Sequence, residues 1–506
     1  MLVLEKIREY AKTGRTALVN RDERMTFAEL DARSEAFAAW LLGRFGNDRA
    51  PVVICGEKES NFLPCILGAL KSGRSYVPID SIIPFQRADE ILAAVKPSVI
   101  VNFTDLPLET SGEVLDAKTT EILLQTCPRE PLPETYWVSG DEAAYILFTS
   151  GSTGKPKGVP ITARNLDFFC KGLLPWYREK GGVILHQVSY SFDVSGCAVY
   201  AGLSNGMTLF TIDRRMMENY RELFELLRGS NLTMWVSTPS FAEVCVRSGV
   251  FDAGLLPSLE QFLFCGEVLT HALCDTLAER FPAARIVNTY GPTEATVLVT
   301  AVEITEKMRR ESRPIPIGAP IAGTMLRLAD AQGQEIYGDE QTGELLILGE
   351  SVGPGYLGRP EFTQKSFFTE PACGLRGYRT GDLCYRVGQL YYYSGRADNQ
   401  LKLSGFRVEL EDIEQNLQRL PNVVRAVVLP VYNAKKADHL AAFLLLREPD
   451  GLTALKRAIQ IKRQAANYLP VYMIPRKIFT VDAFPLNVNG KIDRQELARR
   501  LREGMV

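Results

Sequence analysis

The stretch TSGSTGKPKG, residues 149–158, carries the side chains best suited to binding a phosphate. It combines glycines and small hydroxyl side chains with two lysines, so its backbone amides can turn toward an anion while the side chains add donors and charge. The candidate phosphate-binding residues are Thr149, Ser150, Gly151, Ser152, Thr153, Gly154, Lys155 and Lys157. The order excludes a Walker A loop, because Pro156 follows Lys155. A Gly/Ser/Thr cluster alone is equally typical of a solvated loop.

Three apolar segments each lead into a polar, glycine-containing stretch. Residues 145–148 (YILF) precede the candidate phosphate loop, residues 262–264 precede Cys265, Gly266 and Glu267, and residues 285–287 precede NTYGPTEAT. Short apolar runs of this kind predict buried strands. Ligands of open α/β sheets collect beyond the carboxyl ends of the strands, so the three stretches predict one common site.

Composition limits the class of protein. The chain has 506 residues, 46% of them hydrophobic, with a net charge of −2, which predicts more than one domain and argues against a general nucleic-acid binder. Its ten cysteines show no CxxC spacing, so neither a zinc site nor a disulfide framework is indicated, and free cysteines fit a cytoplasmic location. Glu5 comes too early for a signal peptide, and the longest aliphatic runs are far shorter than the roughly 20 residues that span a bilayer.

The pattern predicts an α/β fold with two domains. Residues 1–396 are expected to form a large domain with mixed sheets and helices in layers, in which residues 27–42 read as an amphipathic helix and residues 52–55 as a strand. Residues 397–506 are expected to form a small, mobile α+β domain. In it, residues 423–429 and 440–446 read as strands and residues 452–469 as a helix. Asp398 at the junction is a candidate hinge, with an ordinary loop carboxylate as the alternative.

Several further motifs follow in order along the chain. They are LKSGRSYVPID (70–80), NTYGPTEAT (288–296), GELLILGESVGPGYLGRPEFT (343–363), YRTGDL (378–383) and PLNVNGKID (485–493). Together with the glycine-rich loop they resemble the adenylate-forming superfamily, which holds acyl-CoA synthetases, luciferases and the adenylation domains of nonribosomal peptide synthetases. The resemblance covers essentially the whole chain. It implies that a carboxylate is joined to the α-phosphate of ATP with release of pyrophosphate, and that a thiol then attacks the adenylate to give a thioester.

The resemblance also implies roles for single residues. Tyr290 would stack on adenine, with Asn288, Thr289, Gly266 and Glu267 beside the nucleotide. Asp382 and Arg396 would bind the ribose, and Glu294 would bind Mg²⁺, an ion that takes hard oxygen ligands. Thr293 would hold the α-phosphate, and Lys491 would bridge the substrate carboxylate and the α-phosphate. Asp398 would be the pivot about which the small domain rotates between the two steps.

Asp193, in the segment SFDVS, indicates which acid is activated. Amino-acid adenylation domains place an aspartate here against the substrate ammonium, a strong charge-assisted contact that a fatty or aryl acid could not make. The alternative is that Asp193 caps a helix. Aligned by motif, the pocket wall is Val194, Cys197, Ser240, Leu263, Cys265, Val297 and Leu298, which predicts a small, apolar or nearly apolar amino acid.

Cys265, in FLFCGE, favours D-alanine as that amino acid. With WVSTPSF (235–241) and NTYGPTEATV it resembles the D-alanine–D-alanyl carrier protein ligases, the branch that feeds teichoic-acid D-alanylation. Alternatively, Cys265 could act simply as a small apolar side chain in the core. Gly196 and Cys197 depart from that branch, so a stand-alone adenylation enzyme for another small amino acid stays open.

The thiol acceptor is expected to be a separate carrier protein bearing phosphopantetheine, and less readily free CoA, because no carrier segment follows the motif around Lys491. One further alternative is an acyl- or aryl-CoA synthetase, and Asp193 argues against it. A second is a catalytically inactive homologue that only binds nucleotide or a partner. The presence of Lys491, Glu294, Asp382 and the full phosphate loop argues against the second.

Overall fold

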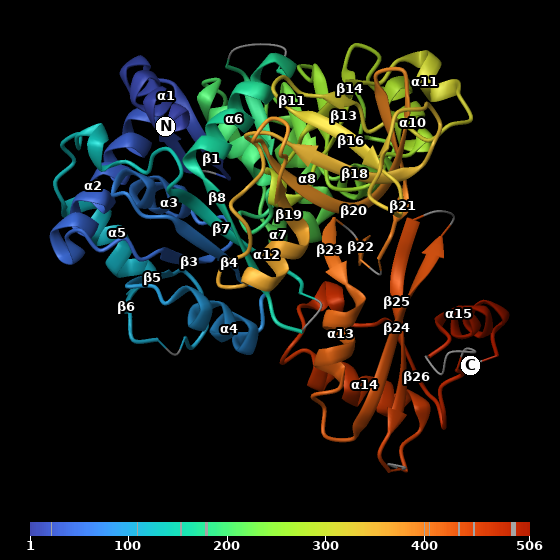
Figure 1. Cartoon of the computed structure of the whole chain (residues 1–506). Coiled ribbons are helices and arrows are strands. Elements are labelled where there is room, and N and C mark those ends of the chain that lie inside the picture. Colours follow the sequence, from blue (N-terminus) through green and yellow to red (C-terminus); the bar gives the residue numbers. More distant parts are fainter. Residues whose placement is uncertain are drawn as a thin grey trace. The chain divides into compact units, whose positions relative to one another are not determined.

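In the computed structural model, the internal contacts of the chain divide it into two units (Figure 1). Unit 1 holds residues 1–81, 94–147 and 158–397, and unit 2 holds residues 82–93, 148–157 and 398–506. The structure describes every residue except 22, 109, 152–153, 178–180, 399, 404, 434–435, 449–450, 487–491 and 506. Each unit has hydrophobic clusters of its own.

The largest sheet of unit 1 has nine strands in the order β15-β14-β13-β12-β11-β9-β10-β1-β2. Strands β1, β10, β9, β11, β12 and β13 are parallel to one another, whereas β2, β14 and β15 pair antiparallel at the edges. The loops after β9, β11, β12 and β13 therefore leave from one edge of the sheet. The bounds are β1 Thr16–Asn20, β2 Glu23–Thr26, β9 Val183–His186, β10 Thr208–Thr211, β11 Met234–Ser237, β12 Gln261–Phe264, β13 Arg285–Tyr290, β14 Thr300–Glu303 and β15 Ala319–Pro320.

A second sheet has six strands in the order β6-β5-β3-β4-β7-β8, with parallel pairing from β6 through β7. Its bounds are β3 Val52–Gly56, β4 Tyr76–Asp80, β5 Val99–Asn102, β6 Glu113–Asp116, β7 Ala143–Thr149 and β8 Lys157–Thr162. A third sheet is antiparallel and contains β16 Met325–Ala329, β17 Glu335–Ile336, β18 Gly343–Leu348, β19 Phe367–Thr369, β20 Arg376–Val387 and β21 Leu390–Arg396.

Helices pack beside these sheets, and side-chain caps fix where several begin. Helix α2 starts at Thr26, whose hydroxyl accepts from the Glu29 amide while the Glu29 carboxylate accepts from the Thr26 amide. The helices are α1 Leu2–Tyr10, α2 Phe27–Phe45, α3 Phe62–Lys71, α4 Phe85–Val95, α5 Ala117–Thr126, α6 Ala163–Leu173, α7 Arg214–Glu218, α8 Tyr220–Arg228, α9 Pro239–Val246, α10 His271–Arg280, α11 Glu306–Arg310 and α12 Pro360–Ser366. A π-helical segment spans Cys197–Gly202.

The carboxyl-terminal part of unit 2 is a small α+β body. Strands β24 Val423–Asn433, β25 Lys436–Leu446 and β26 Lys477–Thr480 form one sheet, and β22 Gln400–Leu403 pairs with β23 Phe406–Glu409. Helices α13 Leu410–Leu417, α14 Ala454–Ala465 and α15 Arg494–Glu503 accompany them. The predicted α/β class, with a large amino-terminal part and a smaller carboxyl-terminal part, is confirmed.

Several expected elements differ in their bounds. The strands expected over residues 423–429 and 440–446 are longer, and the helix expected over residues 27–42 continues to Phe45. The strand expected over residues 285–287 continues to Tyr290, because β14 supplies antiparallel partners to Asn288, Thr289 and Tyr290. These three residues therefore lie on a strand and not in a loop. The helix expected over residues 452–469 is shorter, since Thr453 caps its start and the chain leaves the helix after Ala465.

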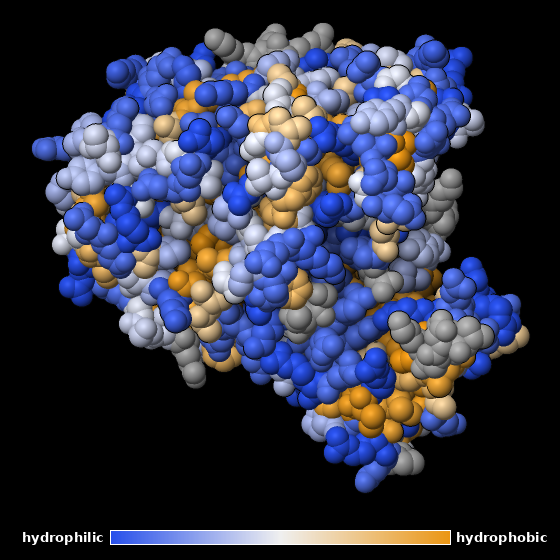
Figure 2. Space-filling model, in the orientation of Figure 1, coloured by the Kyte–Doolittle hydropathy of each residue, from blue (hydrophilic) through white to orange (hydrophobic). Residues whose placement is uncertain are grey.

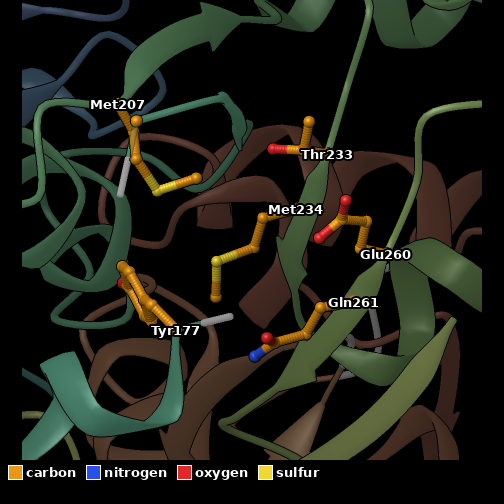
Figure 3. Close-up of a pocket in the computed structure, with 7 residues that line it drawn as sticks. Tyr177, Met207, Thr233, Met234, Glu260 and Gln261 are labelled. Atoms are coloured by element: carbon orange, nitrogen blue, oxygen red, sulfur yellow. The ribbon is translucent and has the colours of Figure 1, made fainter. Parts of the chain in front are cut away.

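Two hollows lie away from the loops singled out in the sequence. One, of about 10 Å³, lies beside the amino ends of β11 and β12 and is lined by Tyr177, Gly181, Met207, Thr233, Met234, Glu260 and Gln261 (Figure 3). It has room for about one water molecule. The other, of about 460 Å³, lies on unit 2 beside α14 and β26, where Figure 2 shows apolar surface.

Candidate functional site

The loops that leave β11, β12 and β13 in unit 1 contact one another. The Thr289 hydroxyl donates to the Phe264 carbonyl across 2.8 Å, and the Ser240 amide donates to the Glu267 carboxylate across 2.9 Å. The Cys265 thiol lies 3.8 Å from the Val297 carbonyl oxygen. Three loops therefore meet at one edge of the nine-stranded sheet. The phosphate loop, which the strand pattern predicted at the same site, follows β7 of the six-stranded sheet and belongs to unit 2, so its place at this site stays a prediction.

The residues expected to form the pocket wall are mostly buried. Val194, Cys197, Leu263, Cys265, Val297 and Leu298 are buried, and Ser240 is half-buried. Burial raises the pKa of the Cys197 thiol, with Cys265 and Asp193 as the nearest acidic neighbours. The Cys197 thiol is therefore held neutral, and it acts as a small apolar side chain rather than as a nucleophile.

Thr296 and Val297 have left-handed backbone conformations, with φ of +59° and +71°. This is a strained conformation for a β-branched residue such as Val297. The Thr296 hydroxyl donates to the Ser351 carbonyl across 2.7 Å, and Gly291 passes so close that an added Cβ would lie 2.4 Å from the Leu298 Cα. Tertiary contacts thus hold a strained turn against the pocket wall.

Asp193 lies half-buried in the loop after β9, and the Thr293 hydroxyl donates to its Oδ2 across 2.6 Å. The Gly196 amide donates to the Asp193 carbonyl across 2.8 Å, which closes a turn before the π-helical segment. A carboxylate consequently stands beside Cys197 and next to a threonine from the loop after β13. This arrangement can hold a cation beside small apolar side chains.

The residues expected at the adenine and ribose form a buried polar group. Asn288 Nδ2 donates to the Pro316 carbonyl across 2.7 Å, while its buried Oδ1 has no hydrogen-bond partner among the described residues. The Tyr290 hydroxyl donates to Asp382, and Arg396 donates to the other Asp382 oxygen across 2.6 Å. Burial, followed by the nearby Asp382 charge, raises the pKa of Tyr290 well above its usual range, so the phenol stays protonated.

Glu294 is completely buried, and its Oε1 accepts a hydrogen bond from the Tyr356 hydroxyl across 2.7 Å. The Tyr356 hydroxyl also lies 3.4 Å from that of Tyr378. Tyr356 lies inside the motif of residues 343–363 but was not among the predicted site residues. In the described part of the chain, no group of three or more His, Cys, Asp and Glu side chains is placed to hold a metal.

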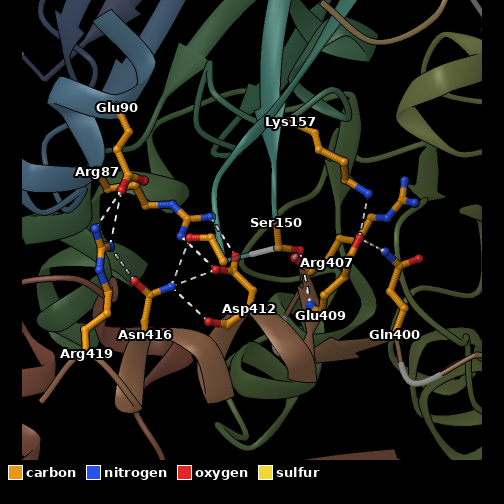
Figure 4. Close-up of polar contacts among 11 residues, drawn as sticks. Arg87, Glu90, Ser150, Lys157, Gln400, Arg407, Glu409, Asp412, Asn416 and Arg419 are labelled. Carbon is orange, nitrogen blue, oxygen red and sulfur yellow. Dashed lines mark hydrogen bonds and ion pairs between the residues drawn. The ribbon is translucent and has the colours of Figure 1, made fainter. Parts of the chain in front are cut away.

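The phosphate loop belongs to unit 2, where its residues bond to the segment around β23 and α13 (Figure 4). Lys157 Nζ lies 2.7 Å from Glu409 Oε1. The Ser150 hydroxyl donates to the Arg407 carbonyl across 3.1 Å and accepts from the Glu409 amide across 3.2 Å. Asn416 Nδ2 donates to the Gly154 carbonyl across 3.2 Å. Burial raises the pKa of Glu409, and the nearby Lys157 charge opposes that shift.

The rest of this loop keeps features suited to an anion. The buried Thr149 hydroxyl has no hydrogen-bond partner in the part of the chain that the structure describes. An added Cβ at Gly151 would lie 2.2 Å from the Lys155 carbonyl oxygen, so only glycine fits there. Lys155 is exposed. Ser152, Thr153 and Lys491, three of the expected site residues, lie outside the described residues.

Asp398 is exposed and is the first residue of the carboxyl-terminal segment of unit 2. Its Oδ1 accepts from the Gln400 amide across 3.1 Å.

Comparison with known proteins identifies the family. The sequence pattern described as AMP-binding enzyme matches residues 6–357, and the pattern described as AMP-binding enzyme C-terminal domain matches residues 412–491. The chain belongs to the AMP-binding enzyme family. The resemblance expected from the motifs is therefore confirmed, and this member is an enzyme of the ligase class.

Relatives of this AMP-binding enzyme cover its full length. A D-alanine–D-alanyl carrier protein ligase of Bacillus anthracis is 39% identical over 504 residues, covering 98% of this chain and 99% of the relative. A ligase of the same name from Bacillus licheniformis is 37% identical over 503 residues, with 98% and 99% coverage. A solved NRPS protein containing adenylation and PCP domains is 26% identical, with a TM-score of 0.82, covering 98% of this chain and 84% of that one.

Among the described residues, none of the helices combines the length and the apolar character needed to cross a membrane.

Proposed function

We propose that this enzyme activates a small amino acid, with D-alanine favoured, as its adenylate and then transfers it to the phosphopantetheine thiol of a separate carrier protein. The observation that carries the proposal is the position of Asp193 beside Cys197, a carboxylate next to a small apolar residue of the expected pocket wall. The full-length relatives named as D-alanine–D-alanyl carrier protein ligases support the same substrate and acceptor.

In this proposal Asp193 accepts the substrate ammonium, while the pocket wall limits the side chain to about the size of a methyl group. A half-buried carboxylate left without a cation would penalise acids that lack an amino group. In this proposal the Cys265 side chain would lie close to the substrate Cα and would disfavour one of the two enantiomers. The residues of the expected wall carry no further charge. The enzyme would therefore select its amino acid by the shape of the side chain and by the contact of the substrate ammonium with Asp193.

ATP and Mg²⁺ fit the residues present. Asn288 Oδ1 and the Thr149 hydroxyl, which lack a hydrogen-bond partner among the described residues, are the kind of buried polar atoms that a nucleotide completes. Asp382 with Arg396 would hold the ribose. The phosphates would lie against Thr149–Lys157 and Thr293. Mg²⁺ would be held by Glu294, a buried carboxylate with hard oxygens, and would neutralise phosphate charge when bound.

Lys491 would supply the positive charge that draws the substrate carboxylate and the α-phosphate together. The reaction needs fixed donors more than a base, because both reacting groups are anionic. We propose a large domain of residues 1–396 and a mobile domain of residues 397–506, with Asp398 as the pivot between the adenylation and thioester steps.

The test is ATP–pyrophosphate exchange with D-Ala, L-Ala, Gly, Ser and D-Ser side by side. D-Ala should support the fastest exchange, and Lys491→Ala should lower it by about 10²–10³ while ATP still binds. A preference for an L-amino acid would instead favour a stand-alone adenylation enzyme. Exchange only with fatty or aryl acids would favour an acyl- or aryl-CoA synthetase, and no exchange with any acid would favour a binding protein without activity.

A further inference from the structure

Lys58 is a buried lysine of unit 1, 4% exposed, that the sequence motifs did not single out. It follows β3 of the six-stranded sheet, and its Nζ lies 2.6 Å from His186 Nε2 at the end of β9 in the nine-stranded sheet. An ammonium group can only donate, so Nε2 accepts. The other ring nitrogen of His186 lies 3.2 Å from the Thr211 hydroxyl. Lys58 thus connects the carboxyl ends of strands in two sheets.

The same ammonium contacts the loop that leads to Asp193. Lys58 Nζ donates to the Val188 carbonyl across 2.6 Å and lies 4.4 Å from the centre of the Tyr190 ring, a cation–π contact. The Tyr190 ring also stacks on Phe62, with centroids 4.5 Å apart and planes 5° apart. Val188 and Tyr190 of this loop are therefore held by one buried charge and one aromatic stack.

Two serines of the loop make further hydrogen bonds. The Ser189 hydroxyl donates to Asp80 across 2.5 Å, and the Ser191 hydroxyl donates to the Pro78 carbonyl across 3.2 Å. Arg214 holds the other Asp80 oxygen at 2.9 Å. Val188, Ser189 and Ser191 are thus hydrogen-bonded to neighbouring segments, and Tyr190 is held by contacts of its ring. Asp193 follows Ser191 by only two residues.

We propose that Lys58 is a positioning residue for amino-acid recognition, which holds residues 187–193 so that Asp193 meets the substrate ammonium. The inference rests on the proposed function for its effect on activity. Burial lowers the pKa of Lys58 to about 7, and Glu57, Asp80 and Glu59 oppose that shift. A lysine kept in such surroundings is costly unless its donors are used, and here they are used on the loop.

The test compares Lys58→Met with Lys171→Met, a matched change at an exposed lysine of α6 in the same unit. In amino-acid-dependent ATP–pyrophosphate exchange, Lys58→Met should raise the KM for the amino acid about 10–100-fold and change the KM for ATP less than about 2-fold, because small misplacements of a recognition group cost about this much. Lys171→Met should change neither. An unchanged amino-acid KM with a lower kcat, or equal rises in both KM values, would overturn the proposal.

A pH profile separates positioning from loss of packing. The groups near Lys58 are Glu57, Glu59, Asp80, His186 and Tyr190, and Arg214 contacts Asp80. Burial and the Lys58 charge keep the pKa of His186 well below its usual range, and burial raises that of Tyr190. Lys58→Met retains all of these groups. The wild-type amino-acid KM should therefore rise, relative to that of Lys58→Met, as the pH passes about 7, and parallel profiles would contradict the role.

Hydrogen–deuterium exchange gives a readout that does not depend on the substrate. Without ligand, amides of residues 187–193 should exchange faster in Lys58→Met than in wild type, while the rest of unit 1 exchanges as before. Ser189→Ala, a milder change, should accelerate the same segment less. Unchanged exchange there would refute the positioning role even if no amino acid supports activity, whereas faster exchange without any amino-acid activity would refute the proposed function alone.

Discussion

The Thr293 hydroxyl donates to the Asp193 carboxylate across 2.6 Å, although the two residues are 100 positions apart in the chain. Asp193 lies in the loop after β9, and Thr293 lies in the loop after β13. In the proposed reaction Asp193 meets the ammonium and Thr293 meets the α-phosphate. One hydrogen bond therefore links the two groups that are proposed to recognise the two substrates.

Replacing Asp193 by Asn keeps the shape of the side chain and removes its charge. The KM for the amino acid should rise about 10²-fold, since removing one partner of a desolvated charge pair costs about 2–5 kcal/mol. The KM for ATP should stay within a few-fold, because the amide oxygen can still accept from Thr293. Steady-state exchange with each substrate varied in turn measures both. An Asp193→Asn enzyme with a normal amino-acid KM would remove the ammonium role.

Cys265 should influence the choice between enantiomers. Cys265→Gly removes the side chain next to the Val297 carbonyl, so the ratio of kcat/KM for D-Ala to that for L-Ala should fall about 10-fold, a usual value for a small group in an apolar pocket. Cys274→Ala is the matched control, because Cys274 is equally buried but lies on α10 in a different hydrophobic cluster. An unchanged ratio in Cys265→Gly would mean that Cys265 only fills space and does not select between the enantiomers.

Many of the proposed site residues could be picked out from the sequence because they lie in short contiguous motifs. Asp193, Cys265 and Glu294 could be found that way, as could the strands that end beside them. The bond from Tyr356 to Glu294, the left-handed turn at Val297 and the contact between Lys58 and His186 could not. Each of these depends on residues from distant segments, which are 128 positions apart for Lys58 and His186. The periodicity of a sequence indicates only which residues share one face of a single helix or strand.

Proline at position 398 should separate the two steps of the reaction. Its fixed φ removes backbone freedom at the proposed pivot, so thioester formation should slow about 10-fold or more, while adenylation falls less. Asp398→Ala is the control, because it removes the contact with the Gln400 amide and keeps the backbone free. Single-turnover assays of adenylate formation and of carrier loading compare the steps. Equal loss in both would argue against a pivot.

The buried ammonium of Lys58 should make the stability of unit 1 depend on pH. Its pKa is about 7 in the folded chain and 10.5 in ordinary surroundings, so the unfolded chain binds more protons between these values. Stability therefore rises with pH across that window, by about 1 kcal/mol per pH unit from this group, and the penalty is complete below pH 7. Lys58→Met lacks this dependence. The four tryptophans all lie in unit 1, so their fluorescence during urea unfolding at pH 7, 8 and 9 reports the difference between wild type and variant. A constant difference would contradict the titration.

The ion pair between Lys157 and Glu409 in unit 2 bears on ATP binding (Figure 4). Lys157 is a proposed phosphate ligand, and in this arrangement its charge is already matched by a mostly buried carboxylate. ATP must then compete with Glu409 for the lysine, which lowers the apparent affinity by the cost of separating the pair. Glu409→Gln removes the competing charge and should tighten ATP binding about 10-fold in equilibrium titrations.

The matched control for that change is Glu90→Gln. It breaks another ion pair of unit 2, with Arg419 at 3.2 Å, that does not bond directly to the phosphate loop, and it should leave ATP affinity unchanged. Weaker ATP binding in Glu409→Gln than in Glu90→Gln would mean that Glu409 orients Lys157 for the phosphates instead of competing with them.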